Sequence, residues 1–269
     1  MPVDKELVMG KLQSRSLRVP LLLVTLVSAV LLSTVLPIRS IYVSAYHMVD
    51  DDLLPALGMA KLEDFKIQVS SVHHLLRFST IIVNVGEGPL EVHGSRPNTS
   101  TPLMSTVQRI YNQTGGYRDV PTPAVMYFAG DGHNHWHVGA LETYQLKRLG
   151  NPTVLVTGAK HGFCFFDTVQ YDLQLPGAPP NAQYGREGCG NAGSLQVKEG
   201  LSVGWGDIYR FNLPDQYIDI TGLPDGSYRL KAIADAAHWF KEIDQNNNST
   251  WVDLKFSDSG TKVEVVDSA

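Results

Sequence analysis

Three histidines at alternate positions, His133, His135 and His137, are the residues whose types and spacing point most clearly to chemistry. A β-strand directs alternate side chains to one face, so we expect the three imidazoles in a row on one side of a strand. A straight strand would separate the outer two by roughly 13 Å, but these long side chains can lean inward to share one ion. A turn or bulge at residues 131–132 would help them to converge. Three imidazoles suit copper, zinc, iron or nickel, and tetragonal nitrogen and oxygen geometry favours Cu(II).

The alternation continues past the histidines, and its opposite face is predicted to be core. This face carries Trp136, Val138, Ala140, Tyr144 and Leu146, with Glu142 as the one exception.

Two other interpretations of the three histidines stay open. One is an exposed histidine-rich strand without a metal, and the other is a zinc hydrolase that uses three histidines and a water. The hydrolase reading lacks a His-Glu-x-x-His segment that would supply a nearby glutamate base.

Composition excludes several classes of protein. The 269-residue chain has a formal charge of −5 and no lysine- or arginine-rich run, so it lacks the basic patch of a nucleic-acid-binding protein. Its two cysteines, Cys164 and Cys189, form no Cys-x-x-Cys pair, which excludes zinc-finger and thioredoxin-like sites. Outside the cell they could form one disulfide, worth about 3 kcal/mol for a loop of about 25 residues. Two buried free thiols are the alternative.

The N-terminal segment predicts passage through or anchoring in a membrane. Residues 19–38 carry no charge and are long enough to cross a bilayer core, whereas Lys5, Lys11, Arg15 and Arg18 precede them. The positive-inside rule then keeps the N-terminus in the cytoplasm and places the rest of the chain outside the cell. The length favours a single-pass anchor in the cell membrane. Cleavage near residues 43–45, as in a signal peptide, would instead yield a secreted protein.

The remaining sequence predicts an all-β, sandwich-like domain with long loops, preceded by one N-terminal transmembrane or signal helix. We therefore divide the chain into an N-terminal segment, 1–46, and one domain, 47–269. Short alternating or β-rich runs are separated by glycine- and proline-rich turns, and residues 94–124 and 171–199 are expected to be mainly loop. Strands are expected at residues 66–69, 75–83, 90–92, 107–111, 125–128, 153–157, 163–166, 216–220, 228–233, 251–256 and 262–266.

Several motifs, in order and with matching spacing, make residues 55–257 resemble the catalytic domain of the lysyl oxidases, in the microbial style. They are the histidine stretch, residues 158–168 (Gly-Ala-Lys-His-Gly-Phe-Cys-Phe-Phe-Asp-Thr), residues 200–209 (Gly-Leu-Ser-Val-Gly-Trp-Gly-Asp-Ile-Tyr) and residues 216–221. Segments 76–78 and 88–92 resemble the start of that domain, and Glu242 with residues 246–247 resembles its end.

The resemblance implies a copper-dependent amine oxidase with a quinone built from its own side chains. By motif, His133, His135 and His137 match the copper ligands, whereas Lys160 and Tyr209 match the pair that forms lysine tyrosylquinone. Such an enzyme oxidatively deaminates primary amines, including lysine side chains of proteins, to aldehydes and releases ammonia and H₂O₂. Its expected partners are thus an amine or lysine-containing protein, O₂, and a membrane through the N-terminal segment.

The general base is not identified by the motifs. Asp207, which lies two residues before Tyr209, is the first candidate, and Asp167 and His161 are two others. The sequence departs from the animal enzymes in having only two cysteines and in placing Ala159, with His161 after the lysine, where those enzymes have a histidine before it. The alternative function is a non-catalytic extracellular β-sandwich that binds a metal.

Overall fold

The computed structural model describes residues 51–129, 133–151, 153–158 and 162–269 of the chain. The chain divides into a unit at Met1–Asp50 and a compact unit at Asp51–Ala269, and only the second is described. The N-terminal helix predicted at residues 19–38 therefore falls outside the described residues. Within the described ranges, no helix is long and apolar enough to cross a membrane.

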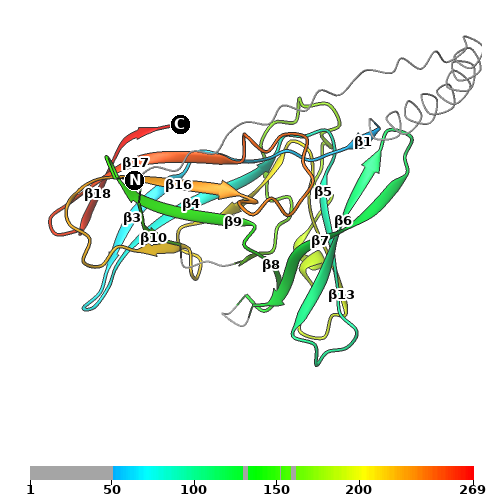
Figure 1. Cartoon of the computed structure of the whole chain (residues 1–269), viewed down its shortest axis with the longest axis horizontal. Helices are drawn as coiled ribbons and strands as arrows, with labels where there is room; N and C mark the ends of the chain where they lie inside the picture. Colours follow the sequence, from blue (N-terminus) through cyan, green and yellow to red (C-terminus); the bar gives the residue numbers. More distant parts are fainter. Residues whose placement is uncertain (1–50, 130–132, 152, 159–161) are drawn as a thin grey trace, which may run out of the picture. The chain divides into compact units, whose positions relative to one another are not determined.

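The described chain is all-β, as predicted, and its strands pair antiparallel in three sheets (Figure 1). The largest sheet has seven strands in the order β11-β8-β7-β6-β5-β13, with β1 paired to β6. Its members are β1 (Asp52–Leu53), β5 (Leu90–Ser95), β6 (Leu103–Asn112), β7 (Tyr117–Phe128), β8 (Trp136–Gly139), β11 (Gly162–Phe163) and β13 (Gln196–Leu201).

The other two sheets form the opposite end of this unit. One has the order β10-β9-β16-β17-β18, formed by β9 (Glu142–Arg148), β10 (Val154–Thr157), β16 (Gly226–Ala234), β17 (Ser249–Ser257) and β18 (Lys262–Ser268). The other has the order β12-β14-β4-β15, with β2 and β3 also paired to β4. It contains β2 (Leu57–Met59), β3 (Glu63–Val69), β4 (His74–Asn84), β12 (Val169–Gln170), β14 (Trp205–Tyr209) and β15 (Tyr217–Asp219).

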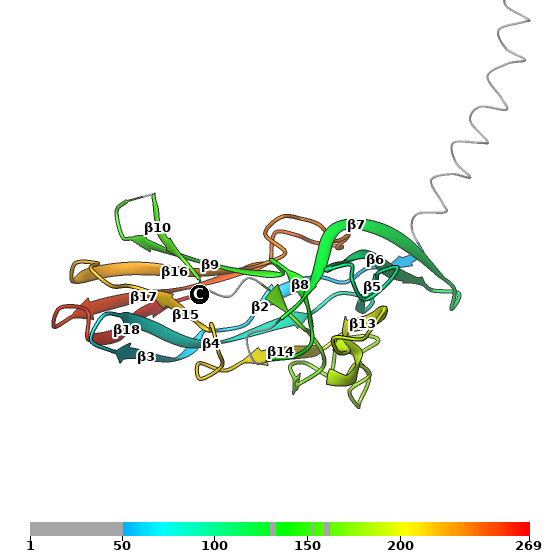
Figure 2. The same ribbon diagram turned by 90° about the horizontal axis from the view of Figure 1, so that it is seen from below.

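These two sheets lie one over the other, with β9, β16 and β17 above β4 and β14 in Figure 2. The apolar residues that alternate with polar ones along these strands pack between the two sheets. Phe78 of β4 meets Tyr144 of β9 edge to face, with ring centroids 5.0 Å apart. Both belong to one continuous apolar core that also contains Trp136, Met126 and Tyr228 from the other strands. The predicted sandwich-like packing is thus present, because each sheet buries one apolar face.

Two of the predicted loops contain strands. Residues 94–124 include most of the β6–β7 hairpin, in which Val107 pairs with Pro121 next to a shift in register. The Ser, Thr and Pro content of this stretch resembles a loop, but a proline can lie in a strand next to such an irregularity. Residues 171–199 include the 3₁₀ helix η1 (Arg186–Cys189) and the start of β13. Conversely, the strand expected at 163–166 is shorter and ends at Phe163.

The continuous strand predicted through the histidines is also wrong. Strand β8 begins at Trp136, ends at Gly139 and belongs to the seven-stranded sheet, whereas β9 begins at Glu142 in a different sheet. The chain changes sheets at Ala140, whose φ of 53° lies in the left-handed region. Four of the five residues predicted for the core face, Trp136, Val138, Tyr144 and Leu146, are buried, whereas Ala140, at the change of sheet, is half-buried. Glu142, the predicted exception, is buried as well.

Candidate metal and tyrosine site

A local turn, rather than a straight strand, brings the three histidines together. Only His137 lies in a strand, β8, and His133 and His135 precede it. The Ala129 N–H donates to the His135 carbonyl at 2.9 Å and the Asn134 N–H donates to the Ala129 carbonyl at 3.2 Å, so residues 134 and 135 are both hydrogen-bonded to Ala129. Asn134 has φ 54°, a left-handed conformation that asparagine tolerates well. This reversal replaces the roughly 13 Å spacing expected for an extended strand.

The three imidazoles converge on one point. His135 Nε2 lies 2.9 Å from His137 Nε2, and His133 Nδ1 lies 3.3 Å from the same His137 atom. One nitrogen from each ring can be chosen so that all three lie within 4.8 Å of one another. His137 is almost fully buried, and the edge of the Tyr127 ring packs against it at a centroid distance of 5.8 Å. A cluster of three imidazole nitrogens fits Cu(II) or another late divalent metal.

Tyr209 lies at the end of β14, opposite Thr80 of β4 in the strand register. Its ring meets that of Phe163 edge to face at a centroid distance of 4.7 Å. Its hydroxyl donates a hydrogen bond to the carbonyl oxygen of Cys164. A disulfide joins Cys164 to Cys189, the last residue of η1. The tyrosine ring is therefore held by the sheet on one side and by the disulfide-linked segment on the other.

One cavity of about 260 Å³ joins the histidine cluster to the tyrosine. His133, His135, Asp207 and Tyr209 all line it, together with apolar side chains that include Phe166 and Leu213. Asp207 and Tyr209 are two residues apart in β14, so their side chains share a face of that strand. The residues that the sequence assigns to metal binding, to the quinone tyrosine and to the base thus meet at one cavity.

Lys160, the predicted lysine of the quinone, lies outside the described residues, as do Ala159 and His161. The described chain on either side ends at Gly158 and resumes at Gly162. Gly162 is paired with Gly139, and Phe163 with Val138, so β11 runs beside the strand that carries His137.

Buried carboxyl groups surround Tyr209. Asp207 is 2% exposed, and Glu142 and Glu199 are each 1% exposed. Burial raises the pKa of Asp207 and of Glu199 well above the usual range for carboxyl groups. Burial, reinforced by the electrostatic influence of the Asp207, Glu142 and Glu199 carboxyl groups, also raises the pKa of the Tyr209 phenol. The phenol is therefore neutral at pH 7 unless a cation is bound nearby.

Glu142 is part of a hydrogen-bond network between the two packed sheets. Its Oε2 atom accepts from the Tyr144 hydroxyl at 2.7 Å and from Thr80 Oγ1 at 3.2 Å. Gln216 Nε2 in turn donates to the Tyr144 hydroxyl at 3.3 Å. Glu142 is thus held in place by neighbours from two strands, β4 and β9, and from the loop that contains Gln216.

Asp167 holds neighbouring parts of the chain together through hydrogen bonds. Its two carboxylate oxygens accept hydrogen bonds from the backbone N–H groups of Gln183, Tyr184 and Ser202, and from Ser202 Oγ, over 2.7–3.2 Å. Four donors leave little capacity to accept a further proton from a substrate. Asp207 Oδ1 accepts a hydrogen bond from Thr168 Oγ1 at 3.0 Å. Of the two aspartates, only Asp207 is among the residues that line the cavity of Tyr209.

Sequence reasoning missed Glu199 and treated Glu142 only as an exception in the core pattern. A signal was available for both. Glu142 alternates with Tyr144 and Leu146, and Glu199 alternates with Val197 and Leu201, so each carboxyl occupies a core position of its strand. A carboxyl at such a position is rarely buried without a functional or hydrogen-bonding reason.

Comparison with known proteins agrees with this geometry. The family model described as "Lysyl oxidase" matches residues 93–266, more than half of the chain. Lysyl oxidase homolog 2 of Gallus gallus is 34% identical over 120 residues, which is 44% of this chain and 14% of that protein. Lysyl oxidase homolog 3 of Homo sapiens is 30% identical over 125 residues, 46% of this chain and 15% of its own length.

The aligned part thus spans about one seventh of these relatives, so the resemblance concerns one domain of much longer proteins. The match of the family model lies in the same unit that contains the three converging histidines and the buried tyrosine. The chain belongs to the lysyl oxidase family.

Proposed function

We propose that this protein is a copper-dependent amine oxidase that converts primary amines, including lysine side chains of proteins, to aldehydes with release of ammonia and H₂O₂. The observation that carries the proposal is the single cavity lined by His133, His135, Asp207 and Tyr209. A metal, a redox-active ring and a proton acceptor are the three parts that such a reaction needs.

His133, His135 and His137 would hold copper through nitrogens that already lie within 4.8 Å of one another. Copper with O₂ would supply the oxidation that joins Tyr209 to Lys160 as lysine tyrosylquinone, the group that accepts electrons from the amine. A cation near Tyr209 would also offset the negative field of the surrounding carboxylates, which favours ionisation of the phenol.

The other residues of the cavity would bind and orient the amine. Phe166, Ile208 and Leu213 line it and can pack against the alkyl chain of a lysine side chain. Asp207 would accept the proton from the carbon next to the amine nitrogen. Its raised pKa, caused by burial, makes its carboxylate a stronger base than an exposed aspartate.

Amine-dependent H₂O₂ release by copper-loaded full-length protein tests the proposal. Wild-type protein should release H₂O₂ with n-butylamine and with Nα-acetyl-lysine amide, and Tyr209→Phe should release none while retaining its copper. The second candidate is a non-catalytic metal-binding domain, which is favoured by the burial of Tyr209 against Phe163 as an ordinary core residue. Full copper with no H₂O₂ release from wild-type protein would support that candidate.

We also propose that residues 19–38 anchor the chain in the cell membrane, with the domain outside the cell. The disulfide between Cys164 and Cys189 supports this placement, because such bonds persist mainly in oxidising compartments. Cleavage of the segment would instead give a secreted protein with the same domain.

A further inference from the structure

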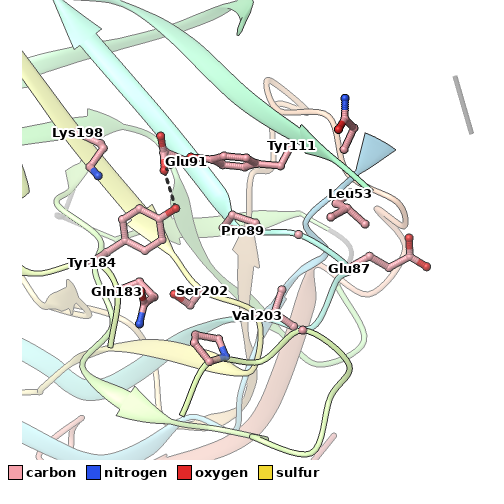
Figure 3. Close-up of a pocket in the computed structure, with 14 residues that line it drawn as sticks. Leu53, Glu87, Pro89, Glu91, Tyr111, Gln183, Tyr184, Lys198, Ser202 and Val203 are labelled. Carbon is pink, nitrogen blue, oxygen red and sulfur yellow. Dashed lines mark hydrogen bonds between the residues drawn. The ribbon is translucent and has the colours of Figure 1, made fainter. Parts of the chain in front are cut away.

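A second cavity, of about 560 Å³, lies apart from the proposed metal and quinone site, because none of His133, His135, His137 and Tyr209 is among its lining residues. Its size is within the roughly 300–1,000 Å³ typical of small-molecule sites. It is formed by side chains from β1, β5, β6, β13 and the loop that precedes η1 (Figure 3). Nothing in the proposed oxidase chemistry uses this cavity.

A buried negative charge lies behind one wall of this cavity. Glu91 Oε2 accepts hydrogen bonds from the Tyr184 hydroxyl at 2.7 Å and from the Tyr111 hydroxyl at 3.1 Å, and Oε1 lies 2.6 Å from His93 Nε2. Burial alone would raise the pKa of Glu91, but these hydrogen bonds outweigh it and lower the pKa to about 2. Glu91 is therefore ionised at neutral pH.

The nearest guanidinium is largely neutralised by another partner. Arg109 Nη1 lies 4.0 Å from Glu91, but Arg109 makes two hydrogen bonds, of 2.8 and 2.9 Å, with both carboxylate oxygens of Asp119. Because the Tyr184 and Tyr111 hydroxyls point at Glu91, the cavity meets their rings and not their O–H donors (Figure 3). Electron-rich rings backed by a carboxylate attract cations.

A cation of the chain already lies near the tyrosine rings of this wall. The ammonium nitrogen of Lys198 lies 5.6 Å from the centroid of the Tyr184 ring. Glu87 lies at the opposite end of the cavity from Lys198, with Pro89 and Tyr111 between them (Figure 3). The lining thus has two carboxylates and one ammonium group, and apolar side chains such as Leu53 and Val203 complete it.

We propose that this cavity binds a primary alkylammonium group, such as the side chain of a lysine in a protein. Its methylene chain would pack on Pro89 and Val203, and its ammonium would lie against the Tyr111 ring, toward Glu87 and away from Lys198. An anionic ligand would have to approach Glu91 and Glu87, and among the described residues that line the cavity Lys198 is the one lysine or arginine that could attract it. The binding itself does not depend on copper or on the quinone.

The segment between the two cavities suggests how they would be used together. Asp167 accepts hydrogen bonds from the N–H groups of Tyr184 and Ser202, which line the second cavity. Its neighbours Phe166 and Thr168 line the cavity that contains Tyr209. The two cavities therefore flank one short segment. If the proposed oxidase function holds, a polypeptide with several lysines could be held at one cavity while another lysine reaches the other.

Calorimetric titration with n-butylammonium chloride tests the binding. The full chain carrying Tyr209→Phe is used, so that the amine cannot react with a quinone, and wild-type protein produced without copper provides a second background. Sodium butyrate is the control ligand of the same length and opposite charge. We expect saturable binding of butylammonium in both backgrounds and weaker or undetectable binding of butyrate.

Two exposed residues of the lining give matched variants of opposite sign. Glu87→Gln should weaken butylammonium binding about two- to fivefold, and Lys198→Gln should strengthen it by a similar factor, as expected for single exposed charges. The proposal is overturned if butylammonium does not saturate in either background, if neither variant changes its affinity, or if butyrate binds better and loses affinity in Lys198→Gln. None of these outcomes bears on H₂O₂ release, so a failure here is distinguishable from a failure of the oxidase function.

Discussion

The hydroxyl of Tyr209 donates its hydrogen bond to the backbone carbonyl of Cys164, the residue that is cross-linked to Cys189. The tyrosine predicted to form the quinone is thus oriented by a segment that a disulfide fixes to η1. The backbone of this segment also carries Phe166, which lines the same cavity. The disulfide therefore contributes to stability and to the position of the tyrosine ring.

Replacing both cysteines with serine should lower the free energy of unfolding by about 3 kcal/mol, because the bond closes a loop with a sequence separation of 25 residues. Urea unfolding followed by tryptophan fluorescence measures this change. Reduction of the wild-type protein with a thiol should have the same effect, and the same thiol should leave the variant unchanged. Identical unfolding of oxidised and reduced wild-type protein would contradict the expected contribution.

His135→Ala should remove most of the copper. Loss of a residue that only orients a metal ligand costs roughly 10–100-fold in affinity, so loss of one of three ligands should cost more. Metal analysis after dialysis against a weak chelator gives the copper content per chain. His73→Ala is the matched control, since His73 is exposed and pairs with Asp219 at 2.9 Å. Full copper in His135→Ala would contradict a site shared by the three histidines.

Asp207→Asn should reduce kcat for amine oxidation by about 10²–10⁴-fold, the usual contribution of a general base, with little change in copper content. A base works only when deprotonated. Because burial raises the pKa of Asp207, activity should increase with pH through a value above that of an ordinary aspartate and reach a plateau beyond it.

The pH profile of kcat separates this role from a structural one. In Asp207→Asn the residual activity should lose that rising limb, whereas Asp172→Asn, at an exposed position, should keep the wild-type profile. An unchanged rising limb in Asp207→Asn would assign the base to another residue.

The proposed topology predicts that external protease reaches the domain. Protease added to spheroplasts or intact cells should digest the region after about residue 46, because the charges of Lys5, Lys11, Arg15 and Arg18 favour a cytoplasmic N-terminus. A cytosolic marker protein should stay intact in the same sample. Full protection of the domain under those conditions would reverse the assignment.

The local parts of this structure could be predicted from the sequence, because strand alternation has a period of two residues and turns have their own residue preferences. The runs around residues 75–83 and 228–233 correspond to β4 and β16. Strands were expected at residues 107–111 and 125–128, within β6 and β7, but residues 117–124 of β7 were missed. Pro121 and Thr122 resemble loop residues, and only pairing with β6 makes this segment a strand.

The site itself required long-range information. Period-two spacing identified the three histidines, but a straight strand cannot bring their nitrogens within 4.8 Å, and the left-handed turn at Asn134 does so. Tyr209 was identified only through a motif. Glu142 and Glu199 lie on strands of two different sheets, and no local pattern in the sequence reports that both lie near Tyr209.

The central claim is that Lys160 and Tyr209 become covalently joined, and mass spectrometry of proteolytic digests tests it most directly. The amine of Lys160 must be neutral to attack an oxidised ring, which requires a partly desolvated lysine. Tyr209→Phe and Lys160→Ala, both of which should keep their copper, are the controls that must lack the product. Protein matured with copper and O₂ should yield one cross-linked pair of peptides that contain Lys160 and Tyr209. Recovery of these residues in two separate, unmodified peptides would contradict the oxidase function and favour a metal-binding domain.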